Sequence, residues 1–277
     1  MARINDIFIG YHQFIKFKMD YIFITNQPDE VVRAESAGIK RIMIDLEVNG
    51  KLERQVGRDT HITNHSIDDI DVIRPLINSA ELLVRVNPLG PDSFEEINHV
   101  IKSGADIVML PMYRTINEVK DFLNIVDSRA RTCLLLETKE ALSNVDEVLH
   151  INGVDEVHVG LNDLHIEVGK KFMFEFLIDG VLENLSKKIL NSKIKFGFGG
   201  VAHFGSGHLD SSLIISEHKR LGSTMVILSR AFRKKTVNLC DEISKINKFI
   251  SNLTPKDLLH NKQKLNLEVQ KIISDMQ

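Results

Sequence analysis

This chain of 277 residues has few cysteines, little net charge and no long apolar run, and each scarcity excludes a class of protein. Its formal net charge is −3, which argues against binding nucleic acid through bulk positive charge. No apolar run reaches the roughly 18 residues that a membrane-spanning helix needs. The N-terminal stretch lacks the apolar core and the cleavage site of a secretory leader. We therefore expect a cytoplasmic protein with no nucleic-acid partner and no membrane partner.

The two cysteines, Cys133 and Cys240, lie far apart and form no CxxC pair. The sequence thus predicts no disulfide framework, which fits a reducing compartment. No cluster of cysteine and histidine has the spacing of a zinc site. With 43% hydrophobic and 26% charged residues, the composition is that of an ordinary globular protein. Because no linker or low-complexity tract interrupts the chain, we expect a single domain over residues 1–277.

Short apolar runs alternate along the chain with segments of helical periodicity, mostly at intervals of roughly 25 residues. The runs predicted as strands cover residues 21–25, 41–47, 81–87, 105–111, 131–138, 156–163, 195–202 and 224–231. The segments predicted as helices cover residues 28–38, 68–80, 93–104, 116–126, 139–151, 177–191, 209–222 and 236–250. Because βαβ units force a parallel sheet, this pattern predicts a closed (β/α)₈ TIM barrel over residues 20–250. A doubly wound open sheet is the alternative.

Residues 251–277 carry apolar side chains at helical spacing, which predicts one more amphipathic helix beyond the barrel. This helix can pack on a neighbouring subunit or on its own barrel. The first arrangement leads us to expect a homo-oligomer, a trimer or a hexamer. The connections over residues 48–66 and 164–176 are longer than the others. Long loops at the carboxyl end of a barrel usually cover a substrate.

Charged residues end several of the predicted strands. Because side chains alternate along a strand, Asp45 and Glu47 face the same side as Met43, and Arg85 faces the same side as Leu83 on the next strand. A charge inside a barrel is costly unless it is paired or bound to a metal ion. The carboxylates of Glu137 and Asp163, completed by water or substrate oxygens, suit Mg²⁺ or Mn²⁺.

Arg85 suits a bidentate contact with a carboxylate of the ligand. Two structural alternatives remain open at these positions. Asp163 is also placed to cap a helix, and Arg85 is also placed to form a salt bridge with Asp45 or Glu47.

Five segments in succession carry a family resemblance: Asp45-Leu-Glu47, Val84-Arg-Val-Asn-Pro88, Gly104-Ala-Asp-Ile-Val-Met-Leu-Pro-Met112, Leu136-Glu-Thr138 and Gly160-Leu-Asn-Asp-Leu164. The series resembles the aldolase/citrate lyase family of the phosphoenolpyruvate/pyruvate barrel superfamily. This family contains 4-hydroxy-2-oxoacid aldolases and citrate lyase β-type subunits. The resemblance covers roughly residues 20–235. It is more specific as a series than in any single segment.

The resemblance implies that Glu137 and Asp163 bind Mg²⁺, Mn²⁺ or another divalent cation. It implies that Arg85 binds the carboxylate or oxo group of a 2-oxoacid substrate. Gly160 would let the backbone pass close to the substrate, and Leu161 and Asn162 follow in the same substrate-binding segment.

The activity that the resemblance implies is that of a class II, metal-dependent aldolase or carbon–carbon lyase. Such an enzyme acts through a pyruvate-type enolate on a 2-oxoacid or hydroxy-oxoacid. A phosphorylated or sugar-derived molecule is compatible with the role of the second reactant. The alternatives are a CoA-thioester lyase of the citrate or malyl type and a non-catalytic barrel that serves as a binding or assembly subunit.

The sequence departs from the aldolases of the family at the general base. Those enzymes carry a histidine just after the acid of the second strand, whereas this chain reads Asp45-Leu-Glu-Val-Asn-Gly50. The candidates for the base are therefore Glu47, Asp45, a metal-bound water, or a histidine from the following loop, His61 or His65. We also expect His65 to contact the substrate.

The glycine-rich segment 197–208 follows the seventh predicted strand. Exposed backbone N–H groups there predict either a phosphate site or tight turns and close packing. The residues bordering it that suit an anion are His203, His208 and Arg230, whereas we expect His218 to be a surface residue or a subunit contact. The basic residues Lys51, Arg54 and Arg58 predict either a solvated run or a contact with an acidic partner.

Overall fold

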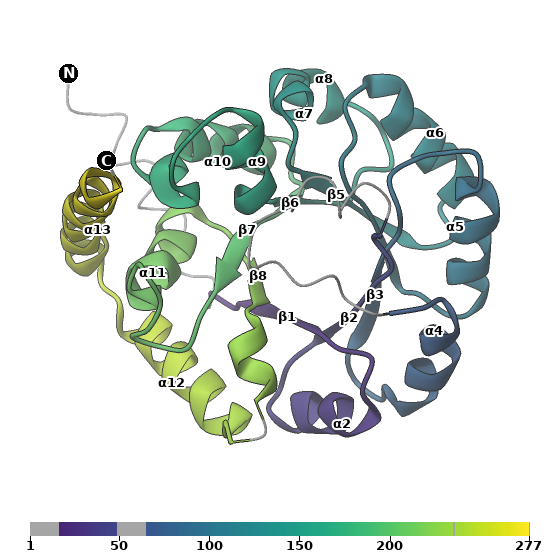
Figure 1. Ribbon diagram of the computed structural model, residues 1–277, viewed down its shortest axis with the longest axis horizontal. Coiled ribbons are helices and arrows are strands. Elements are labelled where there is room, and N and C mark those ends of the chain that lie inside the picture. Colours follow the sequence, from purple (N-terminus) through teal and green to yellow (C-terminus); the bar gives the residue numbers. More distant parts are fainter. Residues whose placement is uncertain (1–16, 49–64, 235, 277) are drawn as a thin grey trace.

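The computed structural model describes residues 17–48, 65–234 and 236–276. Its strands form one closed parallel barrel in which each strand pairs with the next and the last pairs with the first (Figure 1). The strands are β1 (Asp20–Ile24), β2 (Arg41–Asp45), β3 (Glu81–Arg85), β4 (Ile107–Leu110), β5 (Arg131–Leu136), β6 (Glu156–Val159), β7 (Lys195–Val201) and β8 (Met225–Leu228). The prediction of a (β/α)₈ barrel is confirmed, and the doubly wound alternative is wrong.

Helices surround the barrel on all sides (Figure 1). They are α2 (Pro28–Ser36), α4 (Asp68–Ile73), α5 (Ser93–Lys102), α6 (Ile116–Val126), α7 (Lys139–Ser143), α8 (Val145–Val148), α9 (Leu161–Glu167), α10 (Val181–Asn191), α11 (Ser211–Leu221), α12 (Leu239–Asn252) and α13 (Pro255–Asp275). Short 3₁₀ turns η1 (Arg74–Leu76), η2 (Met173–Leu177) and η3 (Arg230–Arg233) complete the connections. Helix α6 shows why such segments begin where they do, because Thr115 and Glu118 form a reciprocal capping box at its first turn.

The strands bury two separate layers of apolar side chains. Residues that face outward pack against the helices in one large core. Residues that face inward fill the barrel, and the buried ones are Ile22, Met43, Leu83, Ile107, Met109, Cys133, Leu135 and Met225. Since Met43 and Leu83 point inward, alternation places Asp45 and Arg85 on the inner side at the strand ends. The inward assignment made from the sequence is therefore correct.

A buried ion pair closes the amino end of the barrel. Arg41 and Glu156 are each 1% exposed, and two parallel hydrogen bonds of 2.5 and 2.7 Å join them. Arg131 approaches the same Glu156 carboxylate at 3.5 Å and also pairs with Glu81. Fork-to-fork pairing of this kind joins the guanidinium and the carboxylate directly, and Nε of Arg41 lies 3.4 Å from Glu81. The amino end is thus sealed by charges that compensate one another.

His158 lies in β6 in register with the inward-facing Leu135 and is buried. Its Nε2 is 3.0 Å from the carbonyl oxygen of Gly199, which only accepts, so Nε2 carries the ring proton. Its Nδ1 has no hydrogen-bond partner among the described residues. A side chain at Gly197 would place its Cβ only 2.7 Å from this Nδ1, so the glycine leaves room for the imidazole. Burial lowers the pKa of His158 to about 4.

Several predicted boundaries differ from the structure. Strand β6 ends at Val159, and residues 161–167 form helix α9, so Asp163 lies on the first helical turn and not at a strand end. The reason is that Gly160 leaves the extended region and that Leu161 and Leu164, three residues apart, bury one face of a helix. The predicted loop 164–176 is consequently occupied in part by α9 and η2. The predicted helix 139–151 is two short helices that meet at Asn144.

The C-terminal helix α13 packs on the barrel of its own chain, beside α11 (Figure 1). Leu265 and Val269 are its buried residues, and Lys262 forms an ion pair with the buried Glu217 of α11. The C-terminal helix is confirmed, and of its two predicted arrangements the structure shows the second. A homo-oligomer stays a prediction. None of the helices that the structure describes is long and apolar enough to cross a membrane.

The amino-end ion pair gives a first test. We expect Arg41→Met to lower the free energy of unfolding by about 3 kcal/mol, because the substitution leaves the Glu156 carboxylate buried without its main partner. Urea unfolding measures this change. As a control, Lys188→Gln breaks the exposed pair with Asp146 and should change the stability by less than about 0.5 kcal/mol. Equal effects of the two substitutions would contradict the role given to the buried pair.

His158 predicts a pH dependence of stability. Its folded-state pKa of about 4 lies below the unfolded value of roughly 6.5. The unfolded state therefore binds more protons between these two pH values, and stability falls as the pH is lowered through this window. Through His158, the natural protein should lose about 2 kcal/mol of stability between about pH 7 and pH 5. We expect the loss in the His158→Gln variant to be smaller by this amount. Urea unfolding at both pH values tests this, and an unchanged pH dependence would contradict it.

Candidate active site

Arg85 lies at the end of β3 and pairs with two carboxylates, one at the end of the neighbouring strand β2 and one two residues after it. Its Nε and Nη2 donate to Oδ1 and Oδ2 of Asp45 at 2.8 and 2.7 Å, and its Nη1 is 3.1 Å from Oε2 of Glu47. Burial would lower the pKa of Arg85, but the two carboxylates raise it well above its usual value. The predicted salt bridge with these acids is therefore present. It fixes the guanidinium in one orientation at the barrel mouth.

His65 lies at the end of the connection that follows β2, and it contacts the end of the same strand. The backbone N–H of Asp45 donates to its Nδ1 at 3.0 Å, so the ring proton resides on Nε2. The backbone N–H of Glu47 donates to Oδ1 of Asp45 at 3.2 Å. The structure thus places His65 beside Asp45, and its contact with a substrate stays a prediction. His61, the other candidate histidine, lies outside the described residues.

Glu137 follows β5 and is buried, with 2% of its surface exposed. Its Oε1 accepts the backbone N–H of Met112 at 3.1 Å. Burial raises the pKa of Glu137 well above its usual value, and the nearby charges of Glu47 and Asp163 raise it further. Arg85 and the Met112 N–H act in the opposite direction without cancelling this effect. Two acidic groups and one arginine thus act on the buried Glu137 carboxylate.

Gly160 leaves space for this carboxylate. A Cβ at Gly160 would lie 2.7 Å from Oε2 and 2.9 Å from Cβ of Glu137. The next two residues are less involved, because Leu161 is buried in the outer apolar core and the side chain of Asn162 is exposed. Asp163 is half-buried on the first turn of α9, close enough for its charge to act on Glu137. The structure therefore gathers Glu137, Gly160 and Asp163 but not the Leu161 side chain.

Metal binding by Glu137 and Asp163 stays a prediction. Among the residues that the structure describes, no three histidine, cysteine or acidic side chains form a ready metal site. A cation bound by Glu137 and Asp163 would therefore need water or substrate oxygens as its other ligands. Mg²⁺ typically keeps several such outside ligands.

The segment after β4 contacts Glu137 and Thr138, although it was quoted from the sequence only as the end of the motif 104–112 and was given no role. Met112 adopts a φ of 53°, which is uncommon for a residue with a side chain, and its N–H points at Glu137. The hydroxyl of Thr138 donates to the carbonyl of Tyr113 at 2.7 Å. Tyr113 itself is buried, and its hydroxyl has no hydrogen-bond partner among the described residues. No local sequence signal predicts these contacts between strands.

His218 is placed differently from the prediction of a surface or contact residue. It is fully buried in α11, stacks on the ring of Phe198 with a centroid separation of 3.7 Å, and bonds to Ser223 through Nδ1 at 2.7 Å. Burial holds its pKa well below the usual value. Charged neighbours in the sequence had suggested a solvated position. One of them, Glu217, is in fact buried with Arg220 and Lys262 as partners.

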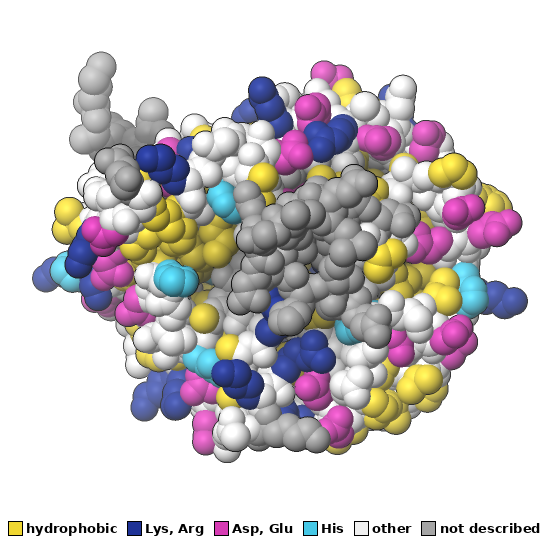
Figure 2. Space-filling model, viewed as in Figure 1, with side chains coloured by type: hydrophobic (Ala, Val, Ile, Leu, Met, Phe, Trp, Pro, Cys, Tyr) yellow, Lys and Arg dark blue, Asp and Glu magenta, His cyan; other side chains and the backbone are white. Residues whose placement is uncertain are grey.

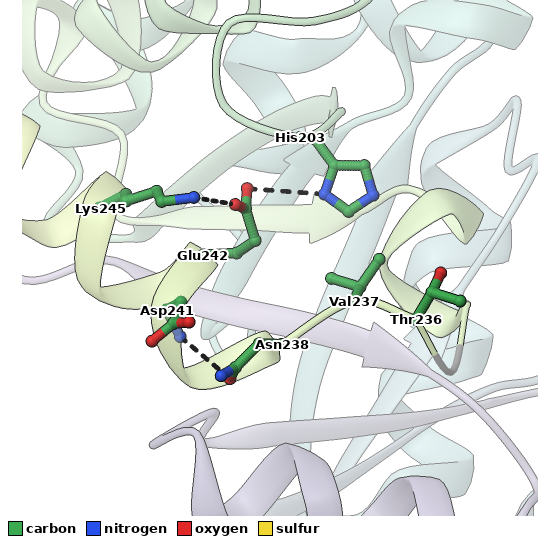
Figure 3. Close-up of a pocket in the computed structure, with 7 residues that line it drawn as sticks. All are labelled: His203, Thr236, Val237, Asn238, Asp241, Glu242 and Lys245. Carbon is green, nitrogen blue, oxygen red and sulfur yellow. Dashed lines mark hydrogen bonds and ion pairs between the residues drawn. The ribbon is translucent and has the colours of Figure 1, made fainter.

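The glycine-rich segment 197–208 borders a surface pocket of about 290 Å³ (Figure 3). His203 and Lys245 both reach Glu242, at 3.5 and 2.7 Å, while Asp241 lies beside them on the first turn of α12. The complete lining is His203, Thr236, Val237, Asn238, Asp241, Glu242 and Lys245. His208 and Arg230 are exposed and do not line it. Two carboxylates among four charged groups give this pocket no preference for a phosphate.

On the face of the molecule drawn in Figure 2, acidic and basic side chains are interspersed across the described residues. This mixed distribution fits the small net charge and provides no broad basic surface there. The basic residues Lys51, Arg54 and Arg58 lie outside the described residues.

Comparison with known proteins matches residues 22–176, more than half of the chain, to the HpcH/HpaI aldolase/citrate lyase family. Two solved structures have the same fold. The HpcH/HpaI aldolase from Desulfitobacterium hafniense DCB-2 has a TM-score of 0.58 at 16% identity and covers 86% of this chain and 95% of its own. An HpcH/HpaI aldolase/citrate lyase family protein from Burkholderia cenocepacia J2315 has a TM-score of 0.60 at 13% identity and covers 76% and 88%.

A curated relative adds a short stretch of sequence similarity. The hydroxypyruvate/pyruvate aldolase of Rhizorhabdus wittichii is 46% identical over 35 residues, which are 13% of this chain and 14% of the relative. The family match, which is much longer, confirms the resemblance inferred from the strand-end motifs and supports a lyase or aldolase activity. The chain belongs to the HpcH/HpaI aldolase/citrate lyase family.

Proposed function

We propose that this protein is a divalent-metal-dependent aldolase or carbon–carbon lyase that acts on a 2-oxoacid or hydroxy-oxoacid through a pyruvate-type enolate. The observation that carries the proposal is the buried carboxylate of Glu137 at the barrel mouth, with the charges of Glu47 and Asp163 acting on it. Family membership supports the same class of reaction. The short match to a hydroxypyruvate/pyruvate aldolase supports a small 2-oxoacid as substrate.

The residues present fit a hard divalent cation. Burying several carboxylates together is costly, and a cation between Glu137 and Asp163 would offset that cost. Gly160 keeps the space beside Oε2 of Glu137 clear of a side chain. Oxygen ligands of this kind suit Mg²⁺, and also Mn²⁺. When bound, the cation supplies a positive charge that stabilises the oxyanion formed as the carbon–carbon bond breaks.

Arg85 would bind the carboxylate or oxo group of the substrate. Its double hydrogen bond to Asp45 fixes the guanidinium plane, and its Nη1 is the arm that also approaches Glu47 at 3.1 Å. A substrate carboxylate can take up hydrogen bonds from the same guanidinium in a fixed geometry. A preset orientation of this kind lowers the cost of positioning the substrate.

Glu47 is our first candidate for the general base, with Asp45 as its support. A carboxylate accepts a proton directly, whereas His65 carries its ring proton on Nε2 in this arrangement and is set to donate. We therefore assign His65 to substrate contact and Glu47 to proton transfer. The pocket beside segment 197–208 contributes two carboxylates and does not support a phosphorylated partner at that position.

Removal of the carboxylate gives the main test of this proposal. We expect Glu137→Gln to reduce Mn²⁺-dependent decarboxylation of oxaloacetate at least about 100-fold, because that reaction also passes through a pyruvate enolate. Arg85→Lys should reduce kcat/KM by about 100-fold as well, since lysine cannot reproduce the fixed fork. A spectrophotometric assay measures both. Glu147→Gln removes an exposed acid on α8 and is the control. Full activity of Glu137→Gln would refute the proposal.

Gly160→Ala tests the space beside Glu137. The added methyl group would lie 2.9 Å from Cβ of Glu137, which cannot swing away as the end of a side chain can. We expect the carboxylate to be displaced and the affinity for Mn²⁺ to fall about tenfold, as measured by isothermal titration calorimetry. Gly200→Ala is the matched control, since the nearest atom to its added methyl group lies 3.4 Å away. Equal affinities of the Gly160→Ala and natural proteins would show that this glycine does not serve the site.

A further inference from the structure

Residues 112–114, just after β4, contact both segments that carry the proposed metal ligands. The N–H of Met112 donates to Glu137, and the carbonyl of Tyr113 accepts the hydroxyl of Thr138. The side chain of Arg114 then extends to the helices that follow β5 and β6. Residues 112–114 therefore form a bridge between these two neighbouring strand ends.

Arg114 is the residue of this bridge whose side chain reaches the neighbouring helices. Its Nη1 and Nη2 donate to the two carboxylate oxygens of Glu167 on α9 at 3.0 and 2.9 Å. The same Nη1 donates to Glu140 on α7 at 2.5 Å. The backbone of Arg114 is held too, because its N–H donates to Glu118 and its carbonyl accepts from Asn144. The guanidinium thus reaches α9 from an anchored position.

Helix α9 is held at its last residue, Glu167, by this contact. It has only seven residues, and its buried residues are Leu161 and Leu164. Apolar packing is not directional. It therefore fixes how deeply a helix is buried better than how the helix is rotated about its own axis. Asp163 and Glu167 are four residues apart and therefore lie one above the other on one side of the helix. A bidentate contact at Glu167 consequently also limits the rotation of Asp163 about the helix axis.

We propose that Arg114 is a positioning residue of the metal site, which holds α9 so that Asp163 stays at a fixed separation from Glu137. This inference rests on the proposed function, because it gives Asp163 and Glu137 a cation to bind. Arg114 itself lies outside the group of residues that would touch the substrate or the cation. Its action is on the geometry of two ligands that come from different strands.

A surface ion pair with no such role would behave differently. The side chains of Arg114, Glu140 and Glu167 are 41%, 48% and 23% exposed, and pairs this exposed contribute little to stability. The melting temperature should therefore change little when the pair is broken. A loss of metal affinity at nearly constant stability separates a positioning role from a merely structural one.

The experiment compares the affinity for Mn²⁺ in the metal-free proteins, by calorimetry, together with the melting temperature. We expect Arg114→Gln and Glu167→Gln each to weaken Mn²⁺ binding about tenfold, which is the usual effect of losing a residue that orients a ligand. Arg114→Lys should recover part of the loss, since it keeps the charge but not the fork. The double variant should bind no more weakly than either single variant, because both remove the same contact.

Two control variants bound the interpretation. Glu140→Gln removes the other partner of Arg114 on a helix without a proposed ligand, and Lys188→Gln breaks a more exposed pair elsewhere. Both should bind Mn²⁺ within about twofold of the natural protein. If Arg114→Gln also stays within about twofold, or if Lys188→Gln weakens binding as much, the inference is wrong. If the natural protein binds no Mn²⁺, the proposed function fails at its metal site, and the role of Arg114 fails with it.

Discussion

The two ends of the barrel treat buried charge in different ways. At the amino end, Arg41 and Glu156 compensate each other in a closed pair. At the carboxyl end, Arg85 already binds Asp45 and Glu47, and the pKa of Glu137 remains raised by burial and by its acidic neighbours. The same fold thus pairs its buried charges at one end and gathers several carboxylates near one arginine at the other. A divalent cation and an anionic substrate would together complete the second end.

Two neighbouring residues give the Glu137 carboxylate its space and a hydrogen bond. Gly160 gives up a side chain beside the carboxylate, and Met112 takes an uncommon φ while it donates its N–H to it. A glycine and a residue with positive φ each cost conformational freedom or stability. Arg114 extends the same arrangement to α9. Such local costs are typical of residues selected for a site and not for folding.

The barrel and half of the site could be predicted from the sequence, because both depend on local periodicity. Alternation around Met43 and Leu83 assigned the inward side of β2 and β3 and therefore the position of Arg85. The apolar run ending at Asp163 was predicted as one strand, because its sequence does not reveal that the strand ends before Gly160 and that a helix begins after it. His218 and the Arg114 contacts escaped prediction for another reason. They depend on side chains that are distant in sequence, and a charged neighbourhood in the sequence does not distinguish solvent from a buried ion pair.

The most direct measurement is a crystal structure of the protein grown with Mn²⁺ and oxalate, a stable mimic of the pyruvate enolate. Our account predicts an anomalous manganese peak about 2.1 Å from a carboxylate oxygen of both Glu137 and Asp163. It also predicts that the oxalate lies between this ion and Arg85. A manganese ion bound elsewhere, or an oxalate that avoids Arg85, would contradict the account.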